Sequence, residues 1–94
     1  MISIVQSQLS ELKERSFSEL TQLPPYQGKK TKQNGKALII SVWKDIVNDG
    51  EIRIVVQVYR HFIFGIGRMT ADGFRINSQG VIHKLSAEEL YDFI

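Results

Sequence analysis

The sequence contains no cysteine, and this absence excludes disulfide bonds and metal sites built on thiolates. It also has no apolar run near the roughly 20 residues that a membrane-spanning helix needs. The amino-terminal residues 1–6 lack the basic start and the long apolar core of a signal peptide. These absences predict a cytoplasmic protein that does not enter a membrane.

A large excess of one charge is missing too, because the formal net charge is only +2. This value is too small to indicate a nucleic-acid-binding protein by itself. The lysines are nevertheless clustered early in the chain, at Lys29, Lys30, Lys32 and Lys36. Lysines at a hairpin tip typically discourage a sheet edge from aggregating, so we interpret the cluster as a solvated edge. Anion binding is the alternative.

The length of 94 residues suffices for one domain, residues 1–94, and leaves no room for a second. A chain this short buries only about two-thirds of its unfolded surface, so self-association would help to stabilise it. The apolar and charged fractions, 43% and 23%, are ordinary for a globular protein and argue against disorder.

Proline is scarce, and both prolines stand together at positions 24 and 25, directly after an apolar stripe. The stripe steps by three or four residues and consists of Ile2, Val5, Leu9, Leu12, Ser16, Leu20 and Leu23. Such spacing predicts an amphipathic helix over about 3–23, ended by the prolines. Ser16 and Glu19 have the spacing of a capping box, which favours a break instead. We expect one helix with room for a kink at Ser16.

Turn signals divide residues 26–85 into short segments. The signals are Asn34-Gly35, Asn48-Asp49-Gly50, Asp72-Gly73 and Gln79-Gly80. Between them lie predicted strands at 36–47, 51–59, 62–71, 74–76 and 81–84. The intervals are too short for crossover helices, so neighbouring strands are expected to run antiparallel.

A short helix is predicted over about 86–94. Ser86 and Glu89 have capping-box spacing, and Leu85 and Leu90 occupy the positions of a hydrophobic staple. The predicted fold class is therefore α+β, with an antiparallel β-meander of four to six strands packed against an N-terminal helix and followed by a short C-terminal helix.

Alternation along the two central strands separates two faces of the predicted sheet. One face is uniformly aliphatic and should meet the N-terminal helix; it comprises Leu38, Ile40, Val42, Ile52, Ile54, Val56 and Val58. The other face mixes large apolar side chains with polar ones, a composition typical of binding hot spots. The C-terminal helix is too short to cover it all. We predict a contact surface comprising Trp43, Arg53, Gln57, Tyr59, His61 and Arg68.

Two glycines, Gly65 and Gly67, fall on one face of a predicted strand. Glycine inside a strand indicates a bulge, a bend or the close approach of another backbone. The third glycine and the following helix of a phosphate-binding loop are both missing, so a structural role is favoured.

Motifs for catalysis, metals and cofactors are missing. Two histidines, His61 and His83, are too few for a typical zinc site without cysteine, and no Gly-x-Ser-x-Gly occurs. Asp45, Asp49 and Glu51 flank one hairpin, but they are too few for a calcium loop. We expect no cofactor. The leading hypothesis is a non-enzymatic protein-interaction module that binds itself as a homodimer or binds another protein.

Two alternatives involve nucleic acid. In the first, an RNA- or DNA-binding protein stacks bases on Trp43 and Tyr59, while Arg53 and the lysines contact phosphates. In the second, the chain is a small ribonuclease-like toxin. Its layout, a helical start before a meander bearing Tyr59, Arg60, His61 and Arg68, is similar to that of ribosome-dependent RNA-cleaving toxins of toxin–antitoxin systems. This likeness implies RNA cleavage.

Overall fold

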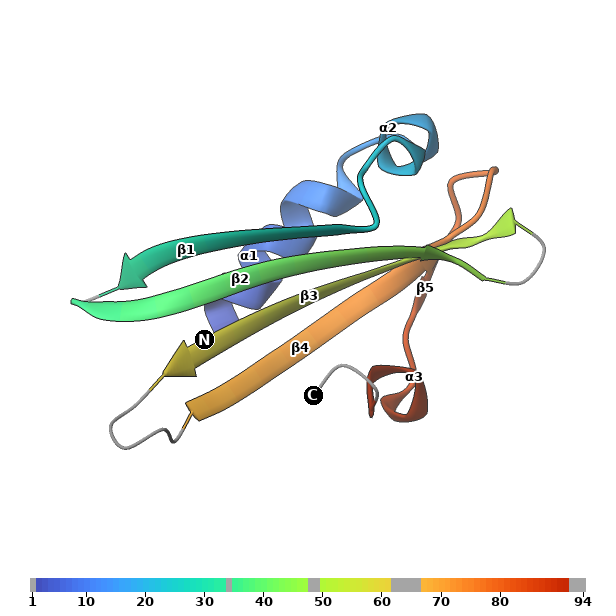
Figure 1. Ribbon diagram of the computed structural model, residues 1–94. Coiled ribbons are helices and arrows are strands. Elements are labelled where there is room, and N and C mark those ends of the chain that lie inside the picture. Colours follow the sequence, from blue (N-terminus) through green and yellow to red (C-terminus); the bar gives the residue numbers. More distant parts are fainter. Residues whose placement is uncertain (1, 34, 48–49, 62–66, 92–94) are drawn as a thin grey trace.

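The computed structural model of the protein describes residues 2–33, 35–47, 50–61 and 67–91 (Figure 1). In chain order the elements are α1 (Ile2–Lys13), α2 (Phe17–Thr21), β1 (Tyr26–Gln33), β2 (Lys36–Ile46), β3 (Ile52–His61), β4 (Gly67–Ile76), β5 (Ile82–Lys84) and α3 (Ala87–Tyr91). The predicted α+β fold is confirmed: a five-stranded antiparallel meander lies between an N-terminal helical segment and a short C-terminal helix.

The sheet has the simplest topology, with the strands adjacent in chain order from β1 to β5 and every neighbouring pair antiparallel. Three of the predicted turns are marked by glycines with positive φ angles, 77° at Gly35, 78° at Gly50 and 81° at Gly80. Glycine adopts this region without the steric cost that other residues bear, which is why these turns could be recognised.

The turn predicted at Asp72-Gly73 is wrong. β4 runs through both residues, which pair with Val56 and Val55 of β3. The strand predicted over 62–71 therefore begins at Gly67 and continues past the expected turn. Residues 62–66, which include Gly65, lie outside the described residues.

Gly73 has a packing role inside β4. A Cβ atom on this residue would lie 2.2 Å from the carbonyl oxygen of Ile54 and 2.9 Å from Cδ1 of Leu85. Only a residue without a side chain allows both neighbours to approach so closely. The same glycine that reads as a turn signal is thus a strand residue that admits Leu85.

The single helix predicted over about 3–23 is also wrong, because α1 ends at Lys13 and α2 starts at Phe17. Ser16 caps α2: its Oγ accepts a hydrogen bond from the backbone N–H of Glu19 at 3.1 Å. The Ser16 hydroxyl also donates to the Glu19 carboxylate at 3.3 Å. The capping box prevails over the continuous stripe, because it satisfies backbone groups at a new helix start.

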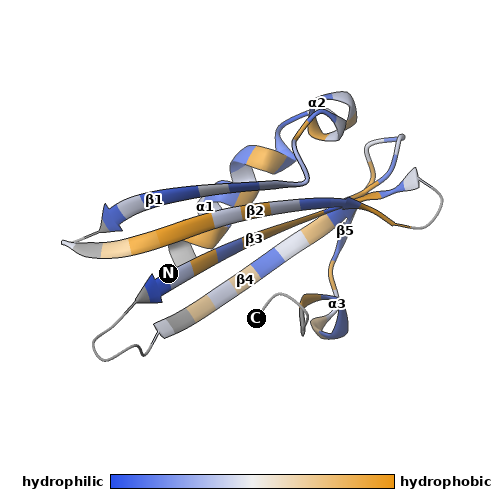
Figure 2. Cartoon of the chain, in the orientation of Figure 1, coloured by the Kyte–Doolittle hydropathy of each residue, from blue (hydrophilic) through white to orange (hydrophobic). Residues whose placement is uncertain are grey.

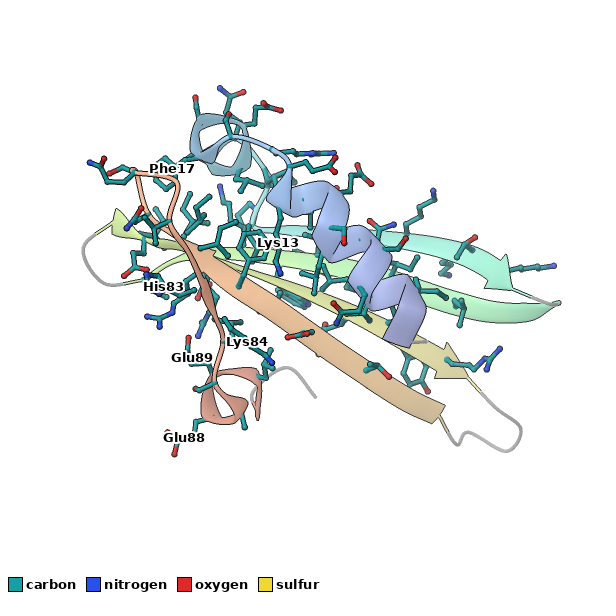
Figure 3. The ribbon with its side chains drawn as sticks, turned by 180° about the vertical axis from the view of Figure 1, so that it is seen from behind. Lys13, Phe17, His83, Lys84, Glu88 and Glu89 are labelled. Atoms are coloured by element: carbon teal, nitrogen blue, oxygen red, sulfur yellow. The ribbon has the colours of Figure 1, made fainter. Side chains whose placement is uncertain are left out.

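One face of the sheet is covered by the N-terminal helices, with α1 lying across it (Figure 3), and we call it the helix face. The core comprises Val5, Leu9, Leu12 and Leu20 of the helices and Leu38, Ile52, Ile54, Val56, Val58, Phe74 and Ile76 of the strands. Ile40 and Val42 pack at its margin and are partly buried. The aliphatic face predicted from alternation is confirmed.

α3 lies beside β4 at the edge of the sheet (Figure 1). The predicted capping box is confirmed, because Ser86 Oγ accepts the backbone N–H of Glu89 at 3.2 Å. Leu85, just before the helix, is buried. Within the described residues, no helix has the length and hydrophobicity to cross a lipid bilayer.

Candidate functional site: the open face of the sheet

The face of the sheet opposite α1, which we call the open face, is organised in cross-strand rows set by the register. The aromatic row contains Tyr26, Trp43, Val55 and Gly73. The middle row contains Gly28, Ser41, Gln57 and Ala71, and the tyrosine row contains Lys30, Ile39, Tyr59 and Met69. Successive rows lie about 7 Å apart, two residues along each strand.

The aromatic row holds two rings in a fixed arrangement. The ring centroids of Tyr26 and Trp43 are 4.4 Å apart, with the planes at 47°. The Trp43 indole N–H donates to Oε1 of Gln57, and the hydroxyls of Tyr26 and Ser41 are 3.3 Å apart. Despite these contacts, 47% of Tyr26 and 38% of Trp43 is exposed. The pair is therefore both ordered and accessible, as binding hot spots require.

The protein's own C-terminal segment covers only one end of the aromatic row. Leu85 packs on Gly73, and Val55 is completely buried. Trp43, one strand further from α3, stays part-exposed. Leu85, just before α3, therefore covers the Gly73 end of this row, while the two rings stay part-exposed.

Two tyrosine rings rest on glycines of the open face. A Cβ on Gly67 would lie 2.2 Å from the hydroxyl oxygen of Tyr59, and a Cβ on Gly28 would lie 2.5 Å from that of Tyr26. Gly67 therefore admits an aromatic side chain, whereas the sequence predicted a bulge, a bend or the approach of another backbone. Because glycine has no side chain, each tyrosine ring can lie directly against the backbone of the sheet.

A further row, nearest α3, contains Asp45, Arg53 and Arg75, and these residues form ion pairs. Arg53 donates to Asp45 through both Nε, at 2.9 Å, and Nη2. Arg75, directly opposite Arg53 in the register, has its Nε 3.5 Å from a Glu89 carboxylate oxygen. Like charges facing each other across strands are unfavourable, and the two carboxylates offset this.

Four of the six predicted contact residues share the open face: Trp43, Arg53, Gln57 and Tyr59. The backbone of His61 pairs with Gly67 in the row beyond Tyr59. Arg68 pairs with Arg60, so its register position is out of step with the other five.

Sequence reasoning missed Tyr26. Its alternation with Gly28 was visible, but only the β1–β2 register places its ring beside Trp43.

The residues behind the ribonuclease-like alternative are neighbours in the register, but their positions alternate between the two faces of the sheet. Tyr59 and His61 alternate with Arg60 along β3, and Arg68 is paired with Arg60. Among the described residues, no three His, Asp or Glu side chains come together as metal ligands. Asp45, one of the weighed carboxylates, is engaged by Arg53, and Asp49 lies outside the described residues.

In the part of the chain that the structure describes, two grooves are lined in part by residues of α1. The larger, about 430 Å³, is lined by Gln6, Lys13, Asp72, Gly73, Phe74, Ile82 and Lys84. Its carboxylate is already engaged, since Asp72 accepts from the Gln6 amide at 3.0 Å and from the Gly73 N–H at 2.8 Å. The smaller groove, about 280 Å³, lies between α1 and strands β1 and β2. Neither groove has a base positioned beside a nucleophile.

The chain matches no protein-family model, no curated protein and no solved structure. Its function is therefore inferred from its own surfaces. The open face offers rings, an amide and apolar side chains in fixed positions, and this is chemistry for binding.

Proposed function

We propose that the chain is a non-enzymatic protein-interaction module, acting in the cytoplasm, that binds a second copy of itself through the open face. The observation that carries the proposal is the Tyr26–Trp43 pair, which is held by Gln57 and Ser41 yet remains part-exposed. Aromatic side chains fixed before binding lose little entropy on association, so they contribute strongly to interfaces.

The shape of the surface favours a second sheet as the partner. Flat sheet faces pack on one another about 10 Å apart, with their side chains interdigitating. The tyrosine row extends the apolar surface beyond Trp43, through part-buried Ile39 and 41%-exposed Met69. A two-fold dimer would bury these side chains in both copies at once and enlarge the small core.

Light scattering over a protein concentration series tests the proposal. The molar mass of the wild type should rise from 10.8 kDa towards twice that value. The double variant Trp43→Ala with Tyr59→Ala should stay at the monomer mass. Met69→Lys, which places a charge on the same face without touching the core, should also stay monomeric.

A matched control separates this face from general surface hydrophobicity. Ile46 is 75% exposed and pairs with the core residue Ile52, so it belongs to the helix face. Ile46→Ala should dimerise like the wild type, and circular dichroism should show that every variant is folded. A wild type that stays monomeric at all concentrations contradicts self-association, as does equal dimerisation of Met69→Lys.

A further inference from the structure

Basic and acidic residues occupy different parts of the molecule. Six of the twelve Lys and Arg residues, and none of the ten Asp and Glu residues, lie in the two stretches 26–40 and 58–71, which contain the end of β1, the start of β2, the end of β3 and the start of β4. These six are Lys29, Lys30, Lys32, Lys36, Arg60 and Arg68. The rest of the chain has six basic and ten acidic residues, a formal charge of −4. We call the positively charged part the basic end.

The meander assembles the basic end from two separate stretches of sequence. Residues 26–44 and 52–71 contain no Asp or Glu. The register pairs Leu38 with both Thr31 and Arg60, so the end of β1, the start of β2 and the end of β3 lie at the same end of the sheet (Figure 1). The long axis of the molecule, 45 Å, keeps this end distant from the acidic residues of α3.

The lysines of β1 are available to a ligand. β1 is an edge strand, and its hydrophilic character stands out beside β2 (Figure 2). Lys29, Lys30 and Lys32 are exposed, and none of them forms a salt bridge within the described part of the chain. Because strand side chains alternate, Lys30 and Lys32 belong to the open face and Lys29 to the helix face. Lys29 shares the smaller groove beside α1 with Glu11, so positive charge predominates on the open face of this edge.

We infer that the basic end binds single-stranded nucleic acid. The lysines of β1 contact phosphates, and Tyr59 stacks on a base. Tyr59 lies in the same row as Lys30, two strands away, which is about 10 Å at the usual strand spacing. This matches the general design of single-strand sites, in which a basic track runs beside aromatic side chains on a sheet.

The geometry of Tyr59 favours a single strand over a duplex. Its ring rests on Gly67 in the flat tyrosine row, between part-buried Ile39 and exposed Met69. Stacking requires a base whose flat face is accessible, and bases in a duplex are stacked on each other. The lysines alone would bind any polyanion, so the ring is what distinguishes the two ligands.

The lysine contacts do not depend on self-association, but Tyr59 belongs to both proposed surfaces, so a dimer that buries the tyrosine row would compete with a base for this ring. Fluorescence anisotropy of a fluorescein-labelled 20-nucleotide oligothymidylate tests the inference. We expect saturable binding that weakens with added salt. If three phosphates are contacted, the slope of log K against log salt should be about −2.

Two double variants with equal charge locate the site. Lys30→Gln with Lys32→Gln should weaken oligothymidylate binding at least tenfold. Lys13→Gln with Lys84→Gln removes the same charge from the groove beside α1 and should bind almost like the wild type. Light scattering of both variants separates the two proposals, because neither set of substitutions removes the rings of the aromatic row.

Two substitutions of Tyr59 test whether its ring stacks on a base. Tyr59→Phe keeps the stacking surface and should bind normally, whereas Tyr59→Leu should bind about tenfold more weakly, within the range measured for lost base stacking. Four outcomes would overturn the inference: no binding by the wild type, equal losses in the two double variants, competition by duplex DNA as effective as by single strands, or normal binding by Tyr59→Leu.

Discussion

The two faces of this sheet are built from alternate residues of the same strands, yet they end in opposite environments. The helix face carries only aliphatic side chains from Ile52 to Val58 of β3, and the protein's own helices bury this stretch. The open face carries Trp43, Gln57 and Tyr59 along β2 and β3. Trp43 donates a hydrogen bond to Gln57, the Tyr59 ring packs on Gly67, and all three side chains remain at least partly exposed. Amphipathic side chains tolerate partial exposure better than aliphatic ones do. The open face can therefore stay accessible to a partner.

The largest difference between the faces should appear in stability. Leu9 of α1 is 2% exposed in the core, and Leu9→Ala should lower the free energy of unfolding by about 2–5 kcal/mol. Met69→Lys on the open face should change it by no more than about 0.5 kcal/mol, since surface substitutions seldom do more. Urea denaturation at a low protein concentration measures both values, and similar losses would show that the open face is part of the core.

Two glycines sharpen the comparison within the open face itself. A Cβ on Gly73 meets the backbone of Ile54, which cannot move aside, so Gly73→Ala should cost about 1–3 kcal/mol. The atoms nearest to a Cβ on Gly67 belong to the far end of the Tyr59 ring, which can rotate away. Gly67→Ala should therefore unfold at nearly the wild-type temperature, and thermal melts of the two variants would contradict this reasoning if their order were reversed.

The smallest expected effect concerns the break between α1 and α2. Ser16→Ala removes the side-chain acceptor for the Glu19 N–H and should cost about 1 kcal/mol. Ser16→Asp keeps an acceptor at the cap and should melt like the wild type. If both variants melted like the wild type, the cap would not be what starts α2.

The two faces were predictable from alternation, because in a long strand with one aliphatic side only that side can face the core. Residues 52–58 alone separate the helix-face side chains from those of the open face, Arg53, Val55 and Gln57. Asp72-Gly73 was misread because the same dipeptide serves in turns and in strands. Only the approach of Ile54 and Leu85, which are distant in sequence, reveals its role.

At the helix break, local sequence was the better predictor. The capping box at Ser16 indicated the start of α2, whereas the longer apolar stripe predicted one continuous helix. Local sequence also predicted part of the candidate surface. Trp43, Gln57 and Tyr59 follow from alternation within single strands. Tyr26 does not, because its contact with Trp43 depends on how the β1–β2 hairpin is registered.

The open face can be observed directly, because Trp43 is the only tryptophan in the chain. Its fluorescence should be recorded with and without acrylamide as the protein concentration rises through the range in which light scattering reports a dimer. We predict that the emission shifts to shorter wavelength and that quenching by acrylamide decreases, because a second copy covers the indole. Dimerisation with unchanged Trp43 emission and quenching would place the interface elsewhere and contradict the proposed role of the open face.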